Sequence, residues 1–403
     1  MTARLIAPLA LIALVVGACG PGGTGGAGGS AAAASYDVQV DNKSTAFNFE
    51  ATAYFPDALT VHPGDTVRFK AIDRGEPHTV TFGTLVDAAV ASLAKRPAPA
   101  PNAPPPPPTA ELAKLPVLIG DPPALPVAQA AAQPCFLATG APPADVKAAC
   151  TKDQQSQKDF DGTQTFFNSG WLAPDQTFGL KLSDSIKPGT YSFICLLHLD
   201  SMTGQLKVVS KDQPADTVDA LKSKSDKQLT DLVAKLKGAV DASSKATADR
   251  AQAGVLTPDA QNVQAPLFAP KEISIPVGGS VTWTILGPHT ITFNTPQDAV
   301  GTLSKASDGT VSLNMKALGP TGGPGQPPPP PAPAPGAAPP PPPPGPIVID
   351  AGKWDGKGFH NSGIFVSFPP VLFAYKLTFT AAGTYPFRCV IHPDMEGTVK
   401  VGQ

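Results

Sequence analysis

Short segments in which apolar and polar residues alternate recur along much of the chain. Residues 58–69 show this period of two around a Pro-Gly-Asp turn, and residues 272–283 repeat the rhythm around a Gly-Gly turn. Runs of β-branched and aromatic residues separated by Gly, Pro and Asp turns are typical of antiparallel sandwiches and barrels. The pattern therefore predicts an all-β fold.

The chain also repeats itself. Pro-His-Thr, Asn-Ser-Gly and a Gly-Thr-Tyr segment leading into a cysteine occur in the same order in both halves; they begin at residues 77, 168 and 189, and again at 288, 361 and 383. A fixed order of landmarks indicates two copies of one unit. We assign residues 36–210 to the first β-domain and residues 261–403 to the second.

A long proline-rich insertion interrupts each copy. The insertions run from about 86 to 150 and from about 295 to 346, and the chain holds 49 prolines in all. Proline runs favour polyproline II or disorder and cannot pair into a sheet. We therefore expect disordered, solvent-exposed insertions, although Cys135 and Cys150 suggest a small ordered excursion within the first.

Residues 211–260 are predicted to link the two domains. Apolar residues recur there at three- and four-residue steps among Lys and Asp, which predicts an amphipathic helix from about Thr217 to Arg250. The pattern does not decide whether this helix packs on a domain or acts as a spacer.

The N-terminal residues 1–18 have the features of an export signal. Arg4 precedes an apolar stretch, residues 5–16, which is too short to span a bilayer, and Val-Gly-Ala leads into Cys19. That ending resembles the lipobox of bacterial lipoproteins and implies lipidation of Cys19, with residues 19–35 as a Gly-rich tether. An ordinary cleaved signal or a membrane anchor is the alternative. In each case we expect the mature protein outside the cytoplasm; with the lipid it would sit on the cell membrane, at the cell surface or in the periplasm.

Charge and cysteine content narrow the function further. The formal net charge is −2, which gives no indication of nucleic-acid binding. Free thiols are unusual in the oxidising environment outside the cytoplasm, where cysteines form disulfides or bind metals. Besides Cys19, two cysteines belong to Cys-x-x-His motifs, and the remaining pair, Cys135 and Cys150, is predicted to form a disulfide; two free thiols are the alternative.

Two matching sets of soft metal ligands follow the repeat. Each contains a distant histidine, a Cys-x-x-His motif and a nearby methionine: His78, Cys195, His198 and Met202 in the first copy, and His289, Cys389, His392 and Met395 in the second. A thiolate, two imidazoles and a thioether suit copper that cycles between two oxidation states. Zinc sites use the same Cys-x-x-His spacing, but methionine is not an expected zinc ligand and each set lacks a further Cys or His. We expect one copper ion in each set.

The other two histidines, His62 and His360, are not repeated as histidine in the other copy. We expect them at the surface or in loops and not as copper ligands. An oxidase or nitrite reductase built from copper-binding β-domains would need a second copper centre with additional histidines, typically in His-x-His pairs. No His-x-His pair occurs in the sequence. We therefore expect no enzyme activity.

At these motifs, both halves resemble the plastocyanin/azurin family of cupredoxins. The second half, with Cys389, His392 and Met395 followed by residues 396–401, is similar to amicyanin-type domains. The match covers residues 36–85 with 155–210, and residues 262–295 with 347–403. The resemblance implies a Greek-key β-barrel with copper near one end, with Met202 and Met395 as axial ligands, and a role in electron transfer.

Two departures from the family matter. The proline-rich insertions are foreign to its simple carriers. The first ligand loop has one more residue between His198 and Met202 than the second has between His392 and Met395, which places the axial role of Met202 in doubt.

Two functions remain open from the sequence. One is electron transfer by two type 1 (blue) copper sites, with redox proteins of the membrane or cell envelope as partners. The other is copper handling at the cell surface, meaning storage, delivery or sensing. The same ligands serve both functions, although a Met/His-rich tail that would favour handling is lacking.

Overall fold

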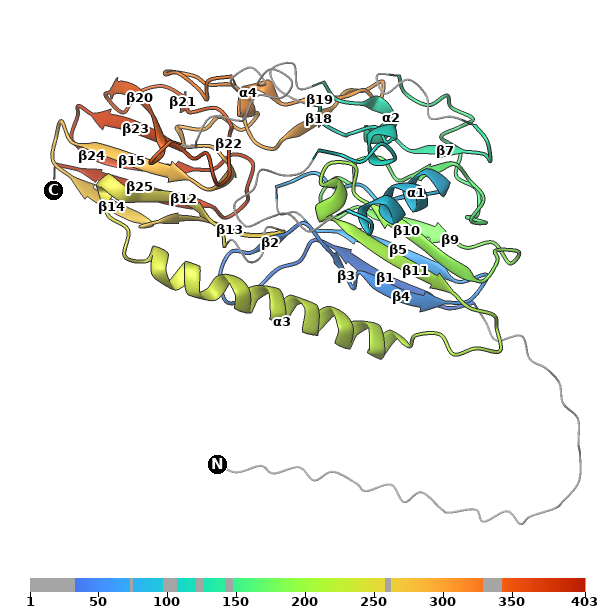
Figure 1. The fold of residues 1–403 in the computed structure, drawn as a ribbon. Helices are drawn as coiled ribbons and strands as arrows, with labels where there is room; N and C mark the ends of the chain where they lie inside the picture. The colour runs from blue at the N-terminus through green and yellow to red at the C-terminus, as the bar shows by residue number, and fades with distance from the viewer. Residues whose placement is uncertain are drawn as a thin grey trace, which may run out of the picture. The chain divides into compact units, whose positions relative to one another are not determined.

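Two β-sheets enclose one core in the first half of the chain (Figure 1). The computed structural model describes residues 33–72, 75–96, 107–120, 126–141, 148–257, 262–328 and 343–402. The strand orders are β3-β1-β5-β9 and β4-β11-β10-β6-β8-β7. The strands are β1 (Ser35–Val40), β3 (Tyr54–Phe55), β4 (Ala58–Val61), β5 (Thr66–Ala71), β6 (Thr81–Phe82), β7 (Cys135–Leu137), β8 (Phe166–Asn168), β9 (Thr177–Lys181), β10 (Gly189–Ile194) and β11 (Thr203–Val208).

The second half repeats this arrangement. Its sheets have the orders β2-β13-β12-β15-β23-β20 and β14-β25-β24-β17-β21, so that β13-β12-β15-β23 corresponds to β3-β1-β5-β9. The strands are β2 (Glu50–Ala51), β12 (Ala251–Val255), β13 (Val263–Ala269), β14 (Glu272–Ile275), β15 (Ser280–Ile285), β17 (Thr292–Phe293), β20 (Ile347–Trp354), β21 (His360–Asn361), β23 (Phe373–Phe379), β24 (Gly383–Arg388) and β25 (Glu396–Val401). The two halves therefore share one order of strands.

Alternation along the strands creates each core. In β5 the buried side chains are Val67, Phe69 and Ala71, and the matching strand β15 buries every second residue in the same way. Phe69 contacts Phe193 edge to face, with ring centroids 5.3 Å apart. Each fully buried Val or Phe side chain contributes about 1.5–3 kcal/mol. The predicted β fold is therefore confirmed, while the Greek-key path of the chain stays a prediction.

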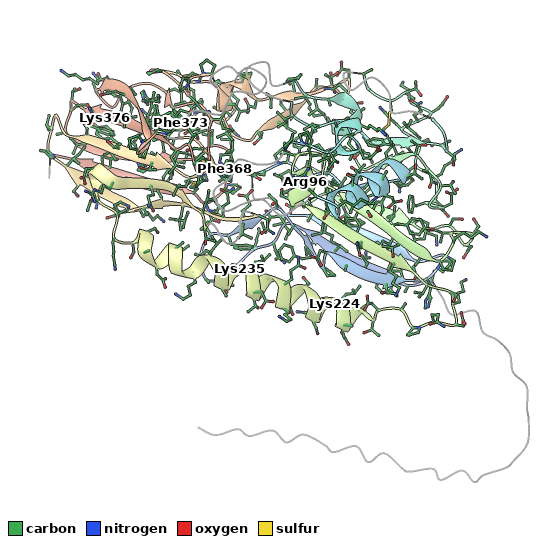
Figure 2. All side chains as sticks on the ribbon, viewed as in Figure 1. Arg96, Lys224, Lys235, Phe368, Phe373 and Lys376 are labelled. Carbon is green, nitrogen blue, oxygen red and sulfur yellow. A yellow bond between two sulfur atoms is a disulfide. The ribbon has the colours of Figure 1, made fainter. Side chains whose placement is uncertain are left out.

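Helix α3 (Val218–Ser243) lies in the range where the sequence predicts an amphipathic helix. The Thr217 hydroxyl caps it by accepting a hydrogen bond from the Ala220 N–H. Its apolar side packs into one buried cluster with strands of both copies; the cluster contains Phe49, Ala51, Ala53, Phe55, Leu232, Leu236, Val255, Val263 and Ala265. Lys224 and Lys235 lie on its exposed side (Figure 2). The helix is therefore packed on both copies and is not a free spacer.

Strand β12 (Ala251–Val255) lies within the range 211–260 that the sequence assigns to the linker. It pairs in parallel with β15 and antiparallel with β13, and so it is an inner strand of the second domain. Its sequence, Ala-Gln-Ala-Gly-Val, has little β-branched or aromatic character, which explains why alternation did not reveal it.

The prediction of a disordered first insertion is wrong for its described residues. They form α1 (Thr84–Leu93), η1 (Leu112–Lys114), α2 (Gln129–Ala132) and β7, and Cys135 and Cys150 form the predicted disulfide. Val86, Leu112 and Leu118 belong to a buried cluster that also includes Ile194 and Leu196. The stretches between the prolines carry enough Leu, Val and Ala to bury a core of their own, and this core packs beside the Cys-x-x-His loop.

The second insertion is also partly ordered, which corrects the same prediction. It forms β18 (Leu303–Lys305), β19 (Val311–Leu313) and α4 (Met315–Leu318). The Gln129 amide donates to the Val311 carbonyl at 2.7 Å, so the two insertions contact each other. The proline-rich residues 329–342 lie outside the described residues.

The expected signal peptide, Cys19 and the tether as far as residue 32 also lie outside the described residues. Within the described residues, no helix has the length and apolar character needed to cross a bilayer.

Candidate metal centres

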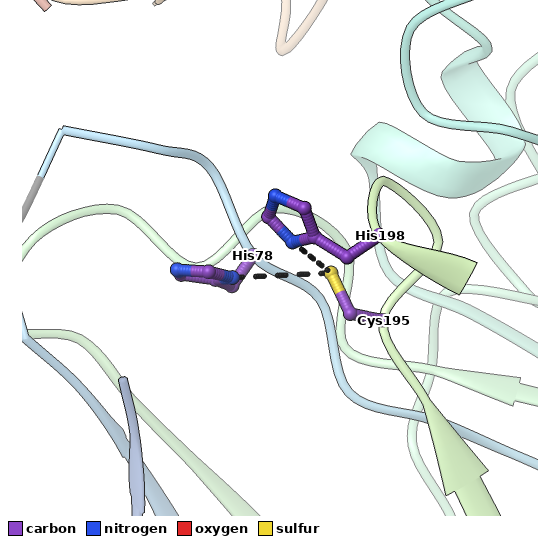
Figure 3. A group of neighbouring side chains, drawn as sticks. All are labelled: His78, Cys195 and His198. Carbon is purple, nitrogen blue, oxygen red and sulfur yellow. Dashed lines mark hydrogen bonds between the residues drawn. The ribbon is translucent and has the colours of Figure 1, made fainter. Parts of the chain in front are cut away.

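The first site brings together His78, Cys195 and His198 (Figure 3). Cys195 directly follows β10, His198 lies three residues later in the same loop, and His78 precedes β6. The Cys195 Sγ lies 3.5 Å from the His198 Nδ1 and 4.0 Å from the His78 Nδ1. The ligand atoms of all three residues lie within 4.8 Å of one another, which is compact enough to hold one metal ion.

The second site has the same construction. His289 ends β16 (Gly287–His289), and Cys389 follows β24. The Cys389 Sγ lies 3.4 Å from the His392 Nδ1 and 4.0 Å from the His289 Nδ1. The two Nδ1 atoms are 3.0 Å apart. All three side chains are buried.

Backbone donors support each sulfur. The N–H of Thr79 donates to the Cys195 Sγ, and the N–H of Thr290 donates to the Cys389 Sγ, each at 3.4 Å. The hydroxyl of Thr79 in turn accepts a hydrogen bond from the N–H of Leu196 at 2.8 Å. These bonds fix the position of the sulfur and stabilise it as a thiolate.

The charges within each site favour the thiolate as well. Burial by itself raises the pKa of the Cys389 thiol, but the charge of His392 and hydrogen bonds with His289 and His392 outweigh it and hold the pKa well below its usual value. In the first site, the charge of His198 and hydrogen bonds with His198 and His78 overcome burial in the same way and hold the pKa of Cys195 well below its usual value. Metal binding needs the deprotonated sulfur, so both sites are prepared for a soft cation.

The two predicted axial methionines are buried near the thiolates. Met202 shares the first core with Cys195, and Met395 shares the second core with Cys389. The carbonyl of each methionine accepts the N–H of its cysteine at 3.0 Å, which closes both ligand loops alike. The additional residue after His198 is thus accommodated, and the axial role of both methionines stays a prediction.

The Asn-Ser-Gly landmark supports the segment that follows the first histidine and leads into β6. Ser169 accepts the N–H of Val80 at 2.9 Å, and the Asn168 Oδ1 accepts the Thr81 hydroxyl at 3.0 Å. The Asn168 amide donates to carbonyls at the end of α2. Ser362 and Asn361 make the matching bonds in the second copy. The sequence showed the repeat of this landmark but not its role.

The remaining histidines take no part in either site. His62 contacts the carbonyl of Gln213 through its Nε2 at 2.8 Å. His360, expected at the surface or in a loop, is instead buried in β21, where its Nε2 lies 2.8 Å from the Tyr375 hydroxyl. Burial lowers its pKa. The ring occupies the core position that Phe167 has in the first copy, and the Tyr375 hydroxyl is the hydrogen-bond partner of its Nε2.

Two carboxylates beside the sites were missed from the sequence. Glu76 accepts from the His198 Nε2 at 2.8 Å, and Glu50 lies 3.1 Å from the His392 Nε2. Although burial opposes it, the hydrogen bond and charge of His198 lower the pKa of Glu76 to about 2. Carboxylates on the outer nitrogen of a ligating histidine fix its tautomer and raise its basicity. Glu76 stands just before the Pro-His-Thr landmark, but nothing in the local pattern marks Glu50.

The donor sets fit copper. Each offers one thiolate and two Nδ1 atoms with a methionine buried in the same core, the soft combination expected of a type 1 site. The fourth ligand that a closed zinc site would use, a further Cys or His, is not among the residues gathered around either sulfur in the described part of the chain.

No family model matches the chain, and no curated protein does. Solved structures do align with it. Auracyanin A, a "blue" copper protein from Chloroflexus aurantiacus, is 17% identical, with 43% of this chain and 98% of that one covered and a TM-score of 0.22. An azurin from Methylomonas sp. strain J is 15% identical (44% and 99% covered, TM-score 0.23), and an amicyanin mutant is 12% identical (43% and 82% covered, TM-score 0.20). At these values the function must be argued from the sites themselves. All of these structures are cupredoxins, the family that the sequence resembles.

Proposed function

We propose that the protein is an electron carrier with one type 1 copper site in each copy, acting at the outer face of the cell membrane. The observation that supports it most is the duplicated, buried set of one thiolate and two Nδ1 atoms. Copper bound there would supply a one-electron redox couple.

The protein's part in such a reaction is to keep the ligands in place. His78 and Cys195 are held by the backbone of neighbouring strands, and Thr79 ties the two together through its N–H and hydroxyl. The same ties recur at Thr290. Ligands fixed in this way need little rearrangement when the charge of the site changes, which favours fast electron exchange.

Burial favours a carrier over a copper-handling protein. A delivery protein must release its metal, which calls for exposed or mobile ligands. Here His78, Cys195, His289, Cys389 and His392 are all buried, and His198 is nearly so. Release of copper would require the ligand loops to open against the hydrogen bonds that close them.

We also propose that the chain turns over no substrate by itself and that redox proteins of the membrane or cell envelope are its partners. Lipid at Cys19 would hold it near them. The two histidines outside the sites, His62 and His360, lie apart from the thiolates, and His360 already contacts Tyr375. They therefore provide no basis for a catalytic copper.

Two rates measured on the copper-loaded protein test the proposal: electron exchange with a small redox mediator, and copper transfer to a competing chelator. We expect fast exchange with slow metal loss. Ready surrender of copper with sluggish exchange would support copper handling instead. Oxygen or nitrite consumption by the isolated protein would contradict both functions.

A further inference from the structure

The outer nitrogen of one histidine in each site faces the contact between the two copies. In the first site the His198 Nε2 meets the Glu76 Oε2 at 2.8 Å. In the second site the His392 Nε2 lies 3.1 Å from the Glu50 Oε2, within ion-pair distance although not aligned as a hydrogen bond. Both histidines are the ones that follow the cysteine, and both use Nδ1 toward the sulfur.

Gln264 joins the two carboxylates. Its side-chain amide donates to the Glu50 Oε2 and to the Glu76 Oε1, each at 3.3 Å. Atoms of Glu50, Glu76 and His392 also lie within 4.8 Å of one another. We call Glu76, Gln264 and Glu50 the carboxylate bridge. It forms a continuous line of side chains from the ring of His198 to the ring of His392.

The backbone around the bridge is firmly connected across the two copies. Strand β2 joins the second copy's sheet beside β13, with Gln264 directly opposite Glu50. The Asn48 amide donates to the Pro393 carbonyl at 3.3 Å, next to His392. The Thr302 hydroxyl donates to the carbonyl of Gly75 at 3.2 Å, next to Glu76. The bridge is therefore a fixed part of the fold and not a chance approach of surface side chains.

Exposure differs between the two sites. Among the described residues, His289 is 0% and His392 is 1% exposed, whereas the side chain of His198 is 12% exposed. His198 also lines a cavity of about 880 Å³ together with Leu197, Ser201 and Ile364. The His198 ring of the first site is thus partly open to solvent, whereas both rings of the second site are almost fully buried, although His392 also borders a smaller cavity of about 380 Å³.

We propose that the second site exchanges electrons with the outside through the first site, across the carboxylate bridge. This inference rests on the proposed function. One electron moves, so that one site is oxidised as the other is reduced; no bond forms or breaks and no proton is transferred. The bridge residues are positioning residues, because they hold the two histidine rings and fill the space between them.

Single-site proteins test the route. Cys389→Ser keeps the first site and Cys195→Ser keeps the second, and oxidised, copper-loaded samples are mixed with hexaammineruthenium(II) while the blue band is followed. We expect the blue band of the isolated first site to disappear rapidly on reduction. The blue band of the isolated second site should disappear slowly, without this fast kinetic phase. In the unaltered protein both sites should be reduced rapidly, because the first serves the second. An isolated second site that is reduced as fast as in the unaltered protein would overturn the inference.

Gln264→Leu tests the bridge itself. Gln264 touches both carboxylates but neither metal-binding nitrogen, so each site should keep its visible spectrum while the fast phase at the second site is lost. Gln129→Leu, which removes a glutamine between the insertions, is the matched control and should leave both phases intact. An unchanged fast phase in Gln264→Leu would refute the bridge as the route.

A readout on the metal-free protein supplements the rates. In nitrogen NMR spectra, the Nε2 resonances of both His198 and His392 should shift in Gln264→Leu, because the bridge joins them. A purely local role of Gln264 predicts a shift at one ring or at neither and would contradict the coupling. Absence of any blue band in the unaltered protein would instead refute the proposed function, so the two failures are distinguishable.

Discussion

Replacing Cys195 by serine is expected to remove one copper ion and part of the blue absorption, and replacing Cys389 is expected to remove the other. The band arises from thiolate-to-copper charge transfer, and serine has no comparable donor. Since each sulfur is enclosed by its own histidines and receives its own backbone N–H, neither site can borrow the other's thiolate. The double variant should be colourless.

Metal analysis and visible spectra of the three variants check this prediction. Circular dichroism serves as the control, because serine is close in size to cysteine and should preserve the β fold. Cys135 and Cys150, which form the disulfide, offer a second control: replacing both should leave the blue band in place. Colour that persists in the Cys195, Cys389 double variant would exclude these thiolates as ligands.

Gly75→Ala should damage the second site although Gly75 belongs to the first copy. Gly75 has φ +106°, and a Cβ there would overlap the carbonyl oxygen of Ile391 in the second ligand loop. The positive φ alone costs a residue with a side chain about 1–2 kcal/mol. The overlap with backbone adds to that cost, and it can be relieved only if the loop that carries His392 moves away.

Gly309→Ala is the matched control, because Gly309 has φ +92° and open space where a Cβ would lie. Denaturant unfolding should show that the free energy of unfolding falls by about 1–2 kcal/mol in this control and by more in Gly75→Ala. With Cys195→Ser in the background, the blue band of the second site should change only in the Gly75 variant. If both variants lose the same free energy of unfolding and keep the blue band of the second site, the contact between Gly75 and the second ligand loop is unimportant.

The grouping of the candidate ligand residues could be predicted from the sequence because these residues belong to short, repeated motifs. Cys-x-x-His occurs once in each copy, and the structure brings His78 and His289 to within 4.0 Å of the respective sulfurs. The β fold was similarly accessible, since alternation along strands such as β5 and β15 is a local property. Duplication made both inferences stronger than either copy alone would allow.

Other features depend on contacts between distant segments and leave no local pattern. Glu50 and Gln264 are far apart in sequence and meet only because β2 crosses into the second copy's sheet. The fold of the first insertion was hidden by its prolines, although Leu112 and Leu118 are buried between them. His360 was misplaced because its position is not repeated as histidine in the other copy, which suggested a surface or loop role, whereas in the structure the ring is buried beside the Tyr375 hydroxyl.

The central claim, two type 1 copper sites in one chain, is tested most directly by titrating the purified, lipid-free protein with copper while the visible spectrum is recorded. The two buried ligand sets predict about two copper ions per chain. The intense blue band should rise until the second ion is bound and then stop. A protein that binds copper without the blue band, or that is saturated by a single ion, would contradict the account.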